Sequence, residues 1–281
     1  MKCKNILLSI VFIIFTSFLL YSIEGKKAGN LSEIDWVNGR IYSSMVIKVK
    51  NDYNFANNSM EQIDNVKEKT RINFYSILKK INVYESFSVI DFVNDNNLNN
   101  ELTNLIDNSK LYKMEYPDLN TIRITYSISL CGENSLYSML MFDREDFTNE
   151  IKGYIDYNYN TDYTGLIIDA RGELSTFEGE VAKVKPALFL SVKDSEGKLV
   201  FDRYNIDPNI IKNKGMIKYT TNINENFTDR VGKNPLKITA YGIGDKTGSI
   251  IVISEIDAKK ILSTAKTRNS IKSGSIIVIV D

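Results

Sequence analysis

The sequence contains no histidine and only two cysteines, Cys3 and Cys131, among its 281 residues. Without histidine, the chain lacks the side chain that titrates nearest neutral pH and the commonest imidazole metal ligand. Two cysteines cannot supply the paired CxxC motifs of zinc, iron–sulfur or redox sites. If the N-terminus is removed, Cys131 remains alone and cannot form an intramolecular disulfide. We therefore predict a protein that is not an enzyme and that binds no metal or other cofactor.

A charge of one sign is also missing, because 35 Lys and Arg balance 35 Asp and Glu and no long single-sign run occurs. Nucleic-acid-binding proteins carry a basic patch that neutralises phosphates, so we expect no nucleic-acid partner. The composition, with 43% hydrophobic and 25% charged residues, is that of an ordinary globular protein. The length suits one large domain or two smaller ones.

The N-terminus has the pattern of an export signal. Lys2 and Lys4 precede an uncharged, apolar run over residues 6–23, and charge returns at Glu24. This order is typical of a secretory signal peptide. The run is also at the lower length limit for spanning a bilayer, so an uncleaved anchor stays open as an alternative. We predict a signal peptide or N-terminal membrane anchor over residues 1–25, and a protein in the periplasm or on the periplasm-facing membrane surface of a bacterium.

The next part of the chain, residues 31–141, reads as an α/β module with the order β-α-β-α-β-β. Its clearest signal is strict alternation of apolar and polar residues from Thr121 to Leu130, which predicts a half-buried strand. A long helix is predicted from Asn58 or Ser59 to Ile81, because apolar residues recur there at helical spacing. The other predicted elements are strands at 36–49, 84–93 and 111–116 and a helix at 98–106. Such a pattern predicts an α+β fold, with helices packed on one face of a small antiparallel or mixed sheet.

Residues 142–162 are acidic, aromatic and rich in Asn, and we interpret them as a connecting segment with a short helix at 148–157. Residues 163–281 then predict a β-rich C-terminal module with one late helix. That helix begins after Ser254, with Asp257 completing a capping-box variant. Strands are expected at 165–170, 187–192, 199–202, 236–241, 249–253 and 275–280, with a hairpin turn at 194–198.

Three features of the sequence suggest sites. The glycine-rich residues 242–248 resemble a phosphate-binding loop, but their spacing is not that of the P-loop, and a tight hairpin is the favoured interpretation. Asp169 and Arg171 end an apolar strand on one face, where they could bind a ligand or form an ion pair; the ion pair is favoured. A carboxylate group could hold a metal ion or could simply begin a helix, and its members are Asp143, Glu145, Asp146 and Glu150.

Tyrosines form a local cluster among the 16 tyrosines and 13 phenylalanines of the chain. Aromatic faces of this kind can stack on sugar rings, so the cluster is the basis of an alternative function as a ligand- or glycan-binding module. Its members are Tyr154, Tyr157, Tyr159 and Tyr163.

Several blocks of sequence resemble the Lpp-twenty/FlgP-like family of bacterial envelope lipoproteins, some of which belong to flagellar outer-membrane structures. The blocks are residues 34–39 (IDWVNG), 163–172 (YTGLIIDARG), 185–188 (KPAL), 230–236 (RVGKNPL) and 276–281 (IIVIVD). Residues 173–184 look like an insertion, and Cys3 precedes the apolar run, whereas a lipoprotein needs a cysteine just after it. The resemblance implies an envelope protein without known catalytic chemistry. The candidate interaction or structural residues are Trp36, Gly39, Tyr163, Gly165, Asp169, Arg171, Gly172, Pro186, Arg230, Gly232 and Pro235.

Together these features predict an exported, non-catalytic structural or assembly protein of the bacterial envelope that acts through protein–protein contacts. The resemblance implies a flagellar association. Expected partners are envelope or flagellar proteins, a second copy of the chain, and the membrane if the N-terminal segment is retained. The alternative is a periplasmic ligand- or glycan-binding module, and a hydrolase using paired carboxylates ranks third.

Overall fold

The computed structural model of the protein describes residues 33–48, 55–118, 121–142, 148–154 and 159–281, with the side chains of the first long helix described from Asn65 onward. The predicted export or anchor segment, residues 1–25, lies outside these ranges. Residues Ser32–Asp281 form one compact unit. Within the described ranges, no helix is both long enough and apolar enough to cross a membrane.

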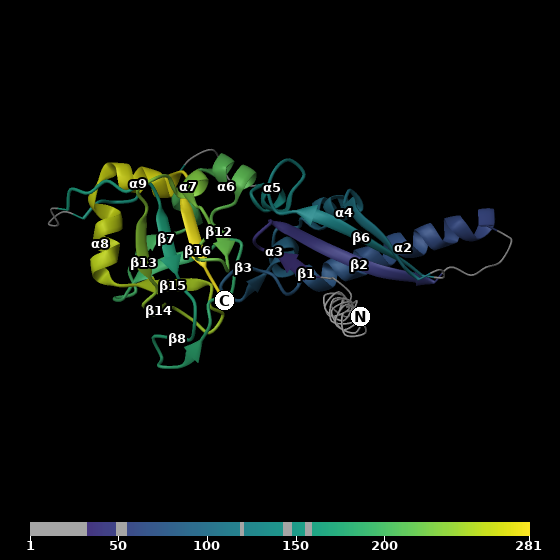
Figure 1. Ribbon diagram of the computed structural model, residues 1–281, viewed down its shortest axis with the longest axis horizontal. Coiled ribbons are helices and arrows are strands. Elements are labelled where there is room, and N and C mark those ends of the chain that lie inside the picture. Colours follow the sequence, from purple (N-terminus) through teal and green to yellow (C-terminus); the bar gives the residue numbers. More distant parts are fainter. Residues whose placement is uncertain (1–32, 49–54, 119–120, 143–147, 155–158) are drawn as a thin grey trace, which may run out of the picture. The chain divides into compact units, whose positions relative to one another are not determined.

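The first sheet is antiparallel throughout and has the strand order β1-β2-β6-β5. Its strands are β1 (Glu33–Asp35), β2 (Arg40–Lys48), β5 (Lys110–Asp118) and β6 (Thr121–Ser129). Helix α2 (Phe55–Leu78) runs along β2 and β6 (Figure 1). Its described apolar positions are buried as the helical spacing predicts, with Val66, Phe74 and Ile77 each at most 7% exposed.

The strand predicted over residues 84–93 is wrong. A short hairpin of β3 (Asn82–Tyr84) and β4 (Phe87–Ser88) is followed at once by helix α3 (Val89–Asp95). The cause is a capping box, in which the Ser88 hydroxyl accepts from the Asp91 amide at 3.2 Å and the Asp91 carboxylate accepts from the Ser88 amide at 3.0 Å. Helix α4 (Asn99–Asp107) lies where the sequence predicts a helix, and α5 (Leu136–Leu140) follows β6.

The C-terminal residues build two further sheets of four strands each. One is parallel, with the order β12-β16-β7-β13, and the other is mixed, with the order β11-β10-β15-β14. The parallel sheet consists of β7 (Leu166–Asp169), β12 (Lys218–Thr220), β13 (Leu236–Thr239) and β16 (Ile276–Ile279). The mixed sheet consists of β10 (Ser191–Asp194), β11 (Leu199–Phe201), β14 (Gly242–Ile243) and β15 (Ile250–Ile253). Strands β8 (Leu174–Ser175) and β9 (Val181–Ala182) form a small antiparallel hairpin.

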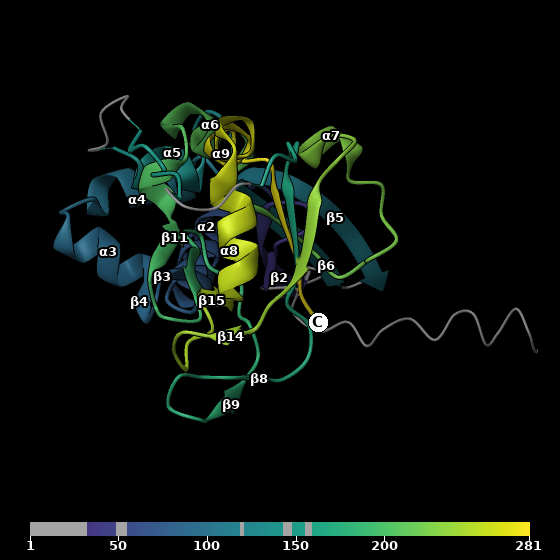
Figure 2. The same ribbon diagram turned by 90° about the vertical axis from the view of Figure 1, so that its left-hand side faces the viewer.

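The helices of this part are short. They are the 3-10 helix η1 (Arg203–Asn205), α6 (Pro208–Lys214), α7 (Thr228–Val231), α8 (Glu255–Ser263) and α9 (Ala265–Lys272). Helix α8 begins at the predicted Ser254 cap and lies over the mixed sheet (Figure 2). The sequence predicts one late helix, whereas a second, α9, follows because the Thr264 side chain accepts from the Thr267 amide and restarts helical structure.

Two other predictions differ from the structure. Residues 148–154 form no helix, because Asn149 donates its amide to the Tyr204 carbonyl at 2.8 Å and accepts from the Asn205 side chain. Residues 155–158 lie outside the described ranges. The strand predicted from residue 187 begins only at Ser191, because the Leu188 and Phe189 amides donate instead to the carbonyls of β3.

Both faces of the central strands β7 and β16 are buried, which explains why these two strands are continuous apolar runs, whereas the outer strand β13 alternates buried and exposed residues. Leu166, Ile168 and Val278 face the main core, whereas Ile167 and Ile279 belong to a second, smaller cluster covered by α7 and Phe227. Strand β16 lies between β12 and β7, so the apolar end of the sequence is paired inside a sheet, as predicted. The protein therefore has an α+β fold, as the sequence indicates.

Candidate functional site

Asp169 and Arg171 lie at the carboxyl end of β7 and form the expected ion pair. The guanidinium donates to both carboxylate oxygens, with Nε–Oδ1 at 2.9 Å and Nη2–Oδ2 at 2.7 Å, and this contact holds the pKa of Asp169 below its usual value. Beside them, the Gly172 amide donates to the Asp281 carboxylate, which also pairs with Lys183 at 3.0 Å. The charged groups at this strand end are thus engaged with one another.

Three of the four glycines among the candidate residues, Gly165, Gly172 and Gly232, serve different purposes. A Cβ atom at Gly165 would lie 2.7 Å from the Ser275 carbonyl oxygen and 2.6 Å from Val231 Cβ, so this glycine allows β7, β16 and α7 to approach closely. Gly232 has φ +73°, and a Cβ there would meet the Thr164 hydroxyl at 2.6 Å. Gly172 has φ +84° and open space around it, so only its backbone conformation favours glycine.

Arg230, on α7, is fixed by the end of α6. Its guanidinium donates to the carbonyls of Lys214 and Gly215 at 2.9 Å each and of Met216 at 3.2 Å. A cation is stabilised at a helix C-terminus, where carbonyl groups are unpaired. Burial lowers the pKa of Arg230. The side chain therefore ties α7 to α6 and has its donors directed into the protein.

Trp36 and the residue that follows Pro186 contact the same buried tyrosine, Tyr219. The ring of Trp36 packs edge-on against Tyr219, with centroids 5.4 Å apart. The Tyr219 hydroxyl donates to the carbonyl of Ala187, the residue after Pro186, and accepts from its amide, both at 3.0 Å. This contact positions the chain as it leaves Pro186.

The remaining candidate residues lie at turns and strand ends. Gly39 has φ +63° between β1 and β2, and its carbonyl accepts from the Leu130 amide at 2.8 Å. Tyr163 donates its amide to the Thr267 hydroxyl at 3.0 Å, and Pro235 immediately precedes β13. The structure thus distributes the candidate residues over several places, and the contacts described for them are internal.

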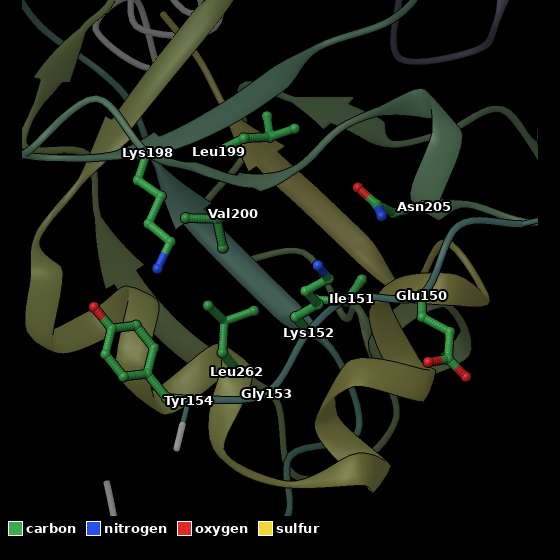
Figure 3. A pocket seen from close by; sticks show the side chains of 10 residues that line it. All are labelled: Glu150, Ile151, Lys152, Gly153, Tyr154, Lys198, Leu199, Val200, Asn205 and Leu262. Carbon is green, nitrogen blue, oxygen red and sulfur yellow. The ribbon is translucent and has the colours of Figure 1, made fainter. Parts of the chain in front are cut away.

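The tyrosine cluster is only partly assembled around a pocket. A pocket of about 540 Å³ is lined by Tyr154 together with Lys198, Val200, Asn205 and Leu262, among other residues (Figure 3). Lys198 extends toward the Tyr154 ring, 4.9 Å from its centroid, and Lys259 lies 5.3 Å from the same centroid. These ammonium groups occupy positions over the ring that a stacked sugar would need.

The other described tyrosines of the cluster contact each other. The rings of Tyr159 and Tyr163 are stacked with centroids 6.2 Å apart, and their hydroxyls are hydrogen-bonded at 2.8 Å. Tyr157 lies outside the described ranges. The cluster therefore does not line one concave surface within the part of the chain that the structure describes.

The glycine-rich residues 242–248 form the predicted hairpin. Strand β14 pairs antiparallel with β15, and the Asp245 carboxylate accepts from the Gly248 amide at 3.0 Å and from the Thr247 hydroxyl. A carboxylate thus occupies amide and hydroxyl donors that a phosphate would use. A Cβ at Gly244 would lie 2.5 Å from Ile250, which leaves little room on that side of the loop.

The acidic candidates do not assemble a site in the described ranges. Asp143, Glu145 and Asp146 lie outside them, and Glu150 borders the pocket beside Tyr154. No group of three or more Asp, Glu or Cys side chains within those ranges could hold a metal ion. A second pocket of about 540 Å³ over the parallel sheet includes carboxylates, but Asp169 is paired with Arg171, Glu225 with Lys218, and Asp257 with Lys260.

Strand β5 has more large, exposed apolar side chains than any other described strand. It is an end strand of its sheet and pairs only with β6 among the described strands, although the Tyr112 ring also packs against Tyr42 of β2 with centroids 4.7 Å apart. Leu111, Tyr112, Met114 and Tyr116 are between 44% and 69% exposed. End strands carry backbone groups that can pair with another chain. We name residues 110–118 the β5 edge.

Sequence reasoning predicted this strand but not its place in the sheet. Pro117 lies within it, and proline is confined to edge strands, first positions or bulges, because it cannot donate to a sheet ladder. That residue was the signal that could have identified an edge. The strand belongs to an α+β protein in which the residues selected from sequence serve packing, while apolar surface is exposed elsewhere.

The C-terminal part of the chain has a recognisable counterpart. Residues 165–281 match the family model described as the second domain of Treponema pallidum Tp0624, a family of unknown function. The match begins at Gly165 and covers the residues from β7 to β16. No curated protein matches the chain.

Proposed function

We propose that this chain is an exported, non-catalytic structural or assembly protein of a bacterial envelope, acting through protein–protein contacts. The observation that carries the proposal is the β5 edge, an end strand with four large, exposed apolar side chains. Exposed apolar surface of this kind is typical of a protein-interaction site. Support for export comes from Lys2 and Lys4 followed by the uncharged residues 6–23.

The predicted site residues are hydrogen-bonded within the chain, which supports a structural function. A ligand site needs polar groups that can turn toward the ligand. Asp169 and Arg171 instead hydrogen-bond to each other, and Arg230 hydrogen-bonds to the Lys214 carbonyl. Relationship to the Lpp-twenty/FlgP-like family, and with it a flagellar association, is the more specific form of the proposal. It depends on the sequence blocks around Trp36, Gly165 and Arg230. We do not extend it to direct lipidation, because Cys3 precedes the apolar run.

The alternative, a periplasmic glycan-binding module, has less support. It would use Tyr154 and the pocket beside it, but Lys198 and Lys259 already lie over that ring. Tyr159 and Tyr163 stack on each other. An interaction protein therefore accounts for more of the described surface.

Site-specific photo-crosslinking in the native bacterium tests the proposal. A photoreactive phenylalanine would replace Tyr116 on the β5 edge or, as a control, Tyr241, since each of these tyrosines is 69% exposed. We expect the protein in an envelope fraction, with defined protein adducts from position 116 and none from position 241. Intact-mass measurement of the same material would show whether the N-terminal segment is retained.

Two results would contradict the proposal. A protein that remains in the cytosolic fraction would remove the envelope location. An exported protein whose intact mass shows the photoreactive group at position 116, but which gives no adduct from that position, would remove the interaction surface.

A further inference from the structure

We propose that the β5 edge joins two copies of this chain, with the two β5 strands antiparallel and Met114 on the two-fold axis. This inference rests on the proposed function, because it names the partner for the interaction surface. The β1-β2-β6-β5 sheet of one copy would then continue into the same sheet of the other copy across the β5 pair. A symmetric interface of this kind requires a surface that complements itself.

The charges along β5 have that property. Lys110 and Lys113 lie four residues and one residue before Met114, and Glu115 and Asp118 lie one residue and four residues after it. Antiparallel pairing about Met114 therefore brings Lys113 opposite Glu115 of the other copy and Lys110 opposite its Asp118. Each opposed pair has opposite charge, and symmetry repeats both pairs.

The charged side chains also share one face of the sheet. Lys110, Lys113, Glu115 and Asp118 lie opposite Ser127, Thr125, Arg123 and Thr121 of β6. Those β6 residues are every second residue of the strand, so their side chains point to one face of the sheet. Directly opposed residues of an antiparallel pair point to the same face, so the four β5 residues do so as well. Register shifts at 111–113 and at 115–118 keep Lys110 and Asp118 on the same face as Lys113 and Glu115. The irregularities flank Met114 on both sides.

Lys113 and Glu115, the charged residues on either side of Met114, would each gain another charged partner in the dimer. Lys113 and Glu115 form an ion pair within the strand, with Nζ–Oε1 at 2.7 Å, and they are 57% and 31% exposed. Glu115 is also paired with Arg123 of β6, with Nη1–Oε2 at 3.9 Å. In the pair of copies, Lys113 and Glu115 would each have an opposite charge across the strand boundary as well. Exposed ion pairs add little affinity but strongly favour one register. The charge pattern therefore selects the antiparallel pairing over a shifted one.

The other face supplies apolar contact. Met114 lies opposite Ile124, which in turn lies opposite Met45, and the Met45 sulfur accepts from Thr70 of α2. Met114 and Leu111 are therefore on the α2 side of the sheet. On that side, the exposed apolar side chains of the two β5 strands would meet. The Tyr116 hydroxyl contacts the Met114 sulfur at 3.2 Å, which places Tyr116 on the same side. Pairing would cover these side chains, whereas the isolated strand leaves them in water.

A charge exchange provides the sharpest test, measured by analytical ultracentrifugation of the full chain in mild detergent. The wild type should be a dimer, and Glu115→Lys should raise the dimer dissociation constant about ten-fold, because two attractive pairs become repulsive. The double variant Lys113→Glu/Glu115→Lys should return the constant to about the wild-type value, since opposite charges again face each other. Glu68→Lys on α2, with the same change in net charge, should leave the constant unchanged.

A second measurement locates the axis. Met114→Cys should give a disulfide-linked dimer under mild oxidation, because directly opposed Cα atoms are about 4.5–5.5 Å apart in an antiparallel pair, which a disulfide can span. Ile72→Cys on α2, where the native side chain is 59% exposed, should not. Circular dichroism of each variant shows whether it is folded.

The outcomes separate this inference from the proposed function. A monomeric wild type at tens of micromolar would overturn the dimer, as would a double variant that stays as weak as Glu115→Lys. If position 116 then crosslinks to a different envelope protein, the proposed function stands and the second copy is the wrong partner. If the protein is dimeric but does not reach the envelope, the dimer stands and the proposed function fails.

Discussion

At the scale of single residues, Tyr219 shows how this protein satisfies buried polar groups. Its hydroxyl donates to the Ala187 carbonyl and accepts from the Ala187 amide, and the side chain is only 2% exposed. Burial raises the pKa of Tyr219 well above its usual value, so the hydroxyl stays protonated. One side chain thus holds both backbone groups of the residue that follows Pro186.

Replacing Tyr219 by phenylalanine should destabilise the protein markedly. Both Ala187 groups would lose a hydrogen-bond partner in a buried place, which costs about 1–3 kcal/mol of the free energy of unfolding. Chemical denaturation followed by circular dichroism measures the change. Tyr241→Phe is the matched control, because that tyrosine is 69% exposed, and it should change the free energy by less than about 0.5 kcal/mol. Equal effects of the two substitutions would show that the Ala187 contacts contribute nothing.

The candidate residues illustrate what sequence can provide at this scale. Local sequence indicates that Gly165 or Arg230 is unusual, but the atoms that explain them belong to distant segments, namely Ser275 for Gly165 and Lys214 for Arg230. The Asp169–Arg171 pair could be predicted, since both partners lie in one strand end. Contacts between distant segments could not.

At the scale of elements, helix α3 depends on its first turn. The Asp91 carboxylate accepts from the Ser88 hydroxyl at 2.6 Å and from the Ser88 amide at 3.0 Å. These hydrogen bonds favour the charged form and lower the pKa of Asp91 below its usual value. A carboxyl group whose pKa is lowered on folding stabilises the folded state at pH values above its unfolded-state pKa. That stabilisation is lost as the pH falls through the lowered, folded-state pKa.

Removing the hydroxyl should therefore change both the titration and the helix. In Ser88→Ala, the pKa of Asp91 should rise toward its usual value, and loss of the cap should cost about 1 kcal/mol of stability at neutral pH. NMR titration of the Asp91 carboxyl carbon measures the first effect, and denaturation at pH 7 measures the second. Ser88→Thr keeps the hydroxyl and should preserve the low pKa. If Ser88→Ala leaves the Asp91 titration unchanged, the capping box does not form in solution.

The same helix explains one failure of prediction. Residues 84–93 are rich in β-branched and aromatic side chains, which favour a strand, but Ser88 and Asp91 have the spacing that predicts the start of α8 at Ser254 and Asp257. Long elements with regular periodicity, such as α2 and β6, were predictable because the signal is repeated along the sequence. Short elements depend on one or two side chains, so a single local hydrogen bond decides them.

At the scale of the whole molecule, the two predicted modules, residues 31–141 and 163–281, contact each other through backbone and side chains. The Phe189 amide donates to the Val83 carbonyl at 2.7 Å, and the Tyr137 hydroxyl donates to the Leu188 carbonyl at 3.0 Å. Trp36 packs on Tyr219. These partners are more than 50 residues apart in the sequence, so no local pattern could have predicted them. The β5 edge was less hidden, because Pro117 favours an edge strand, although only the order of strands shows that β5 ends its sheet.

Such contacts should make residues 32–281 unfold as one cooperative unit. Trp36 is the only tryptophan, and it reports on the contact with Tyr219, whereas circular dichroism reports on the helices and strands of the whole chain. If the modules unfold together, denaturation followed by the two signals should give coincident curves, as a two-state transition requires. In Tyr219→Phe, both curves should shift by the same amount, because loss of a contact in a cooperative unit lowers the stability of all of it. Separate midpoints, with the two curves shifted by different amounts in that variant, would instead show that the two modules unfold independently.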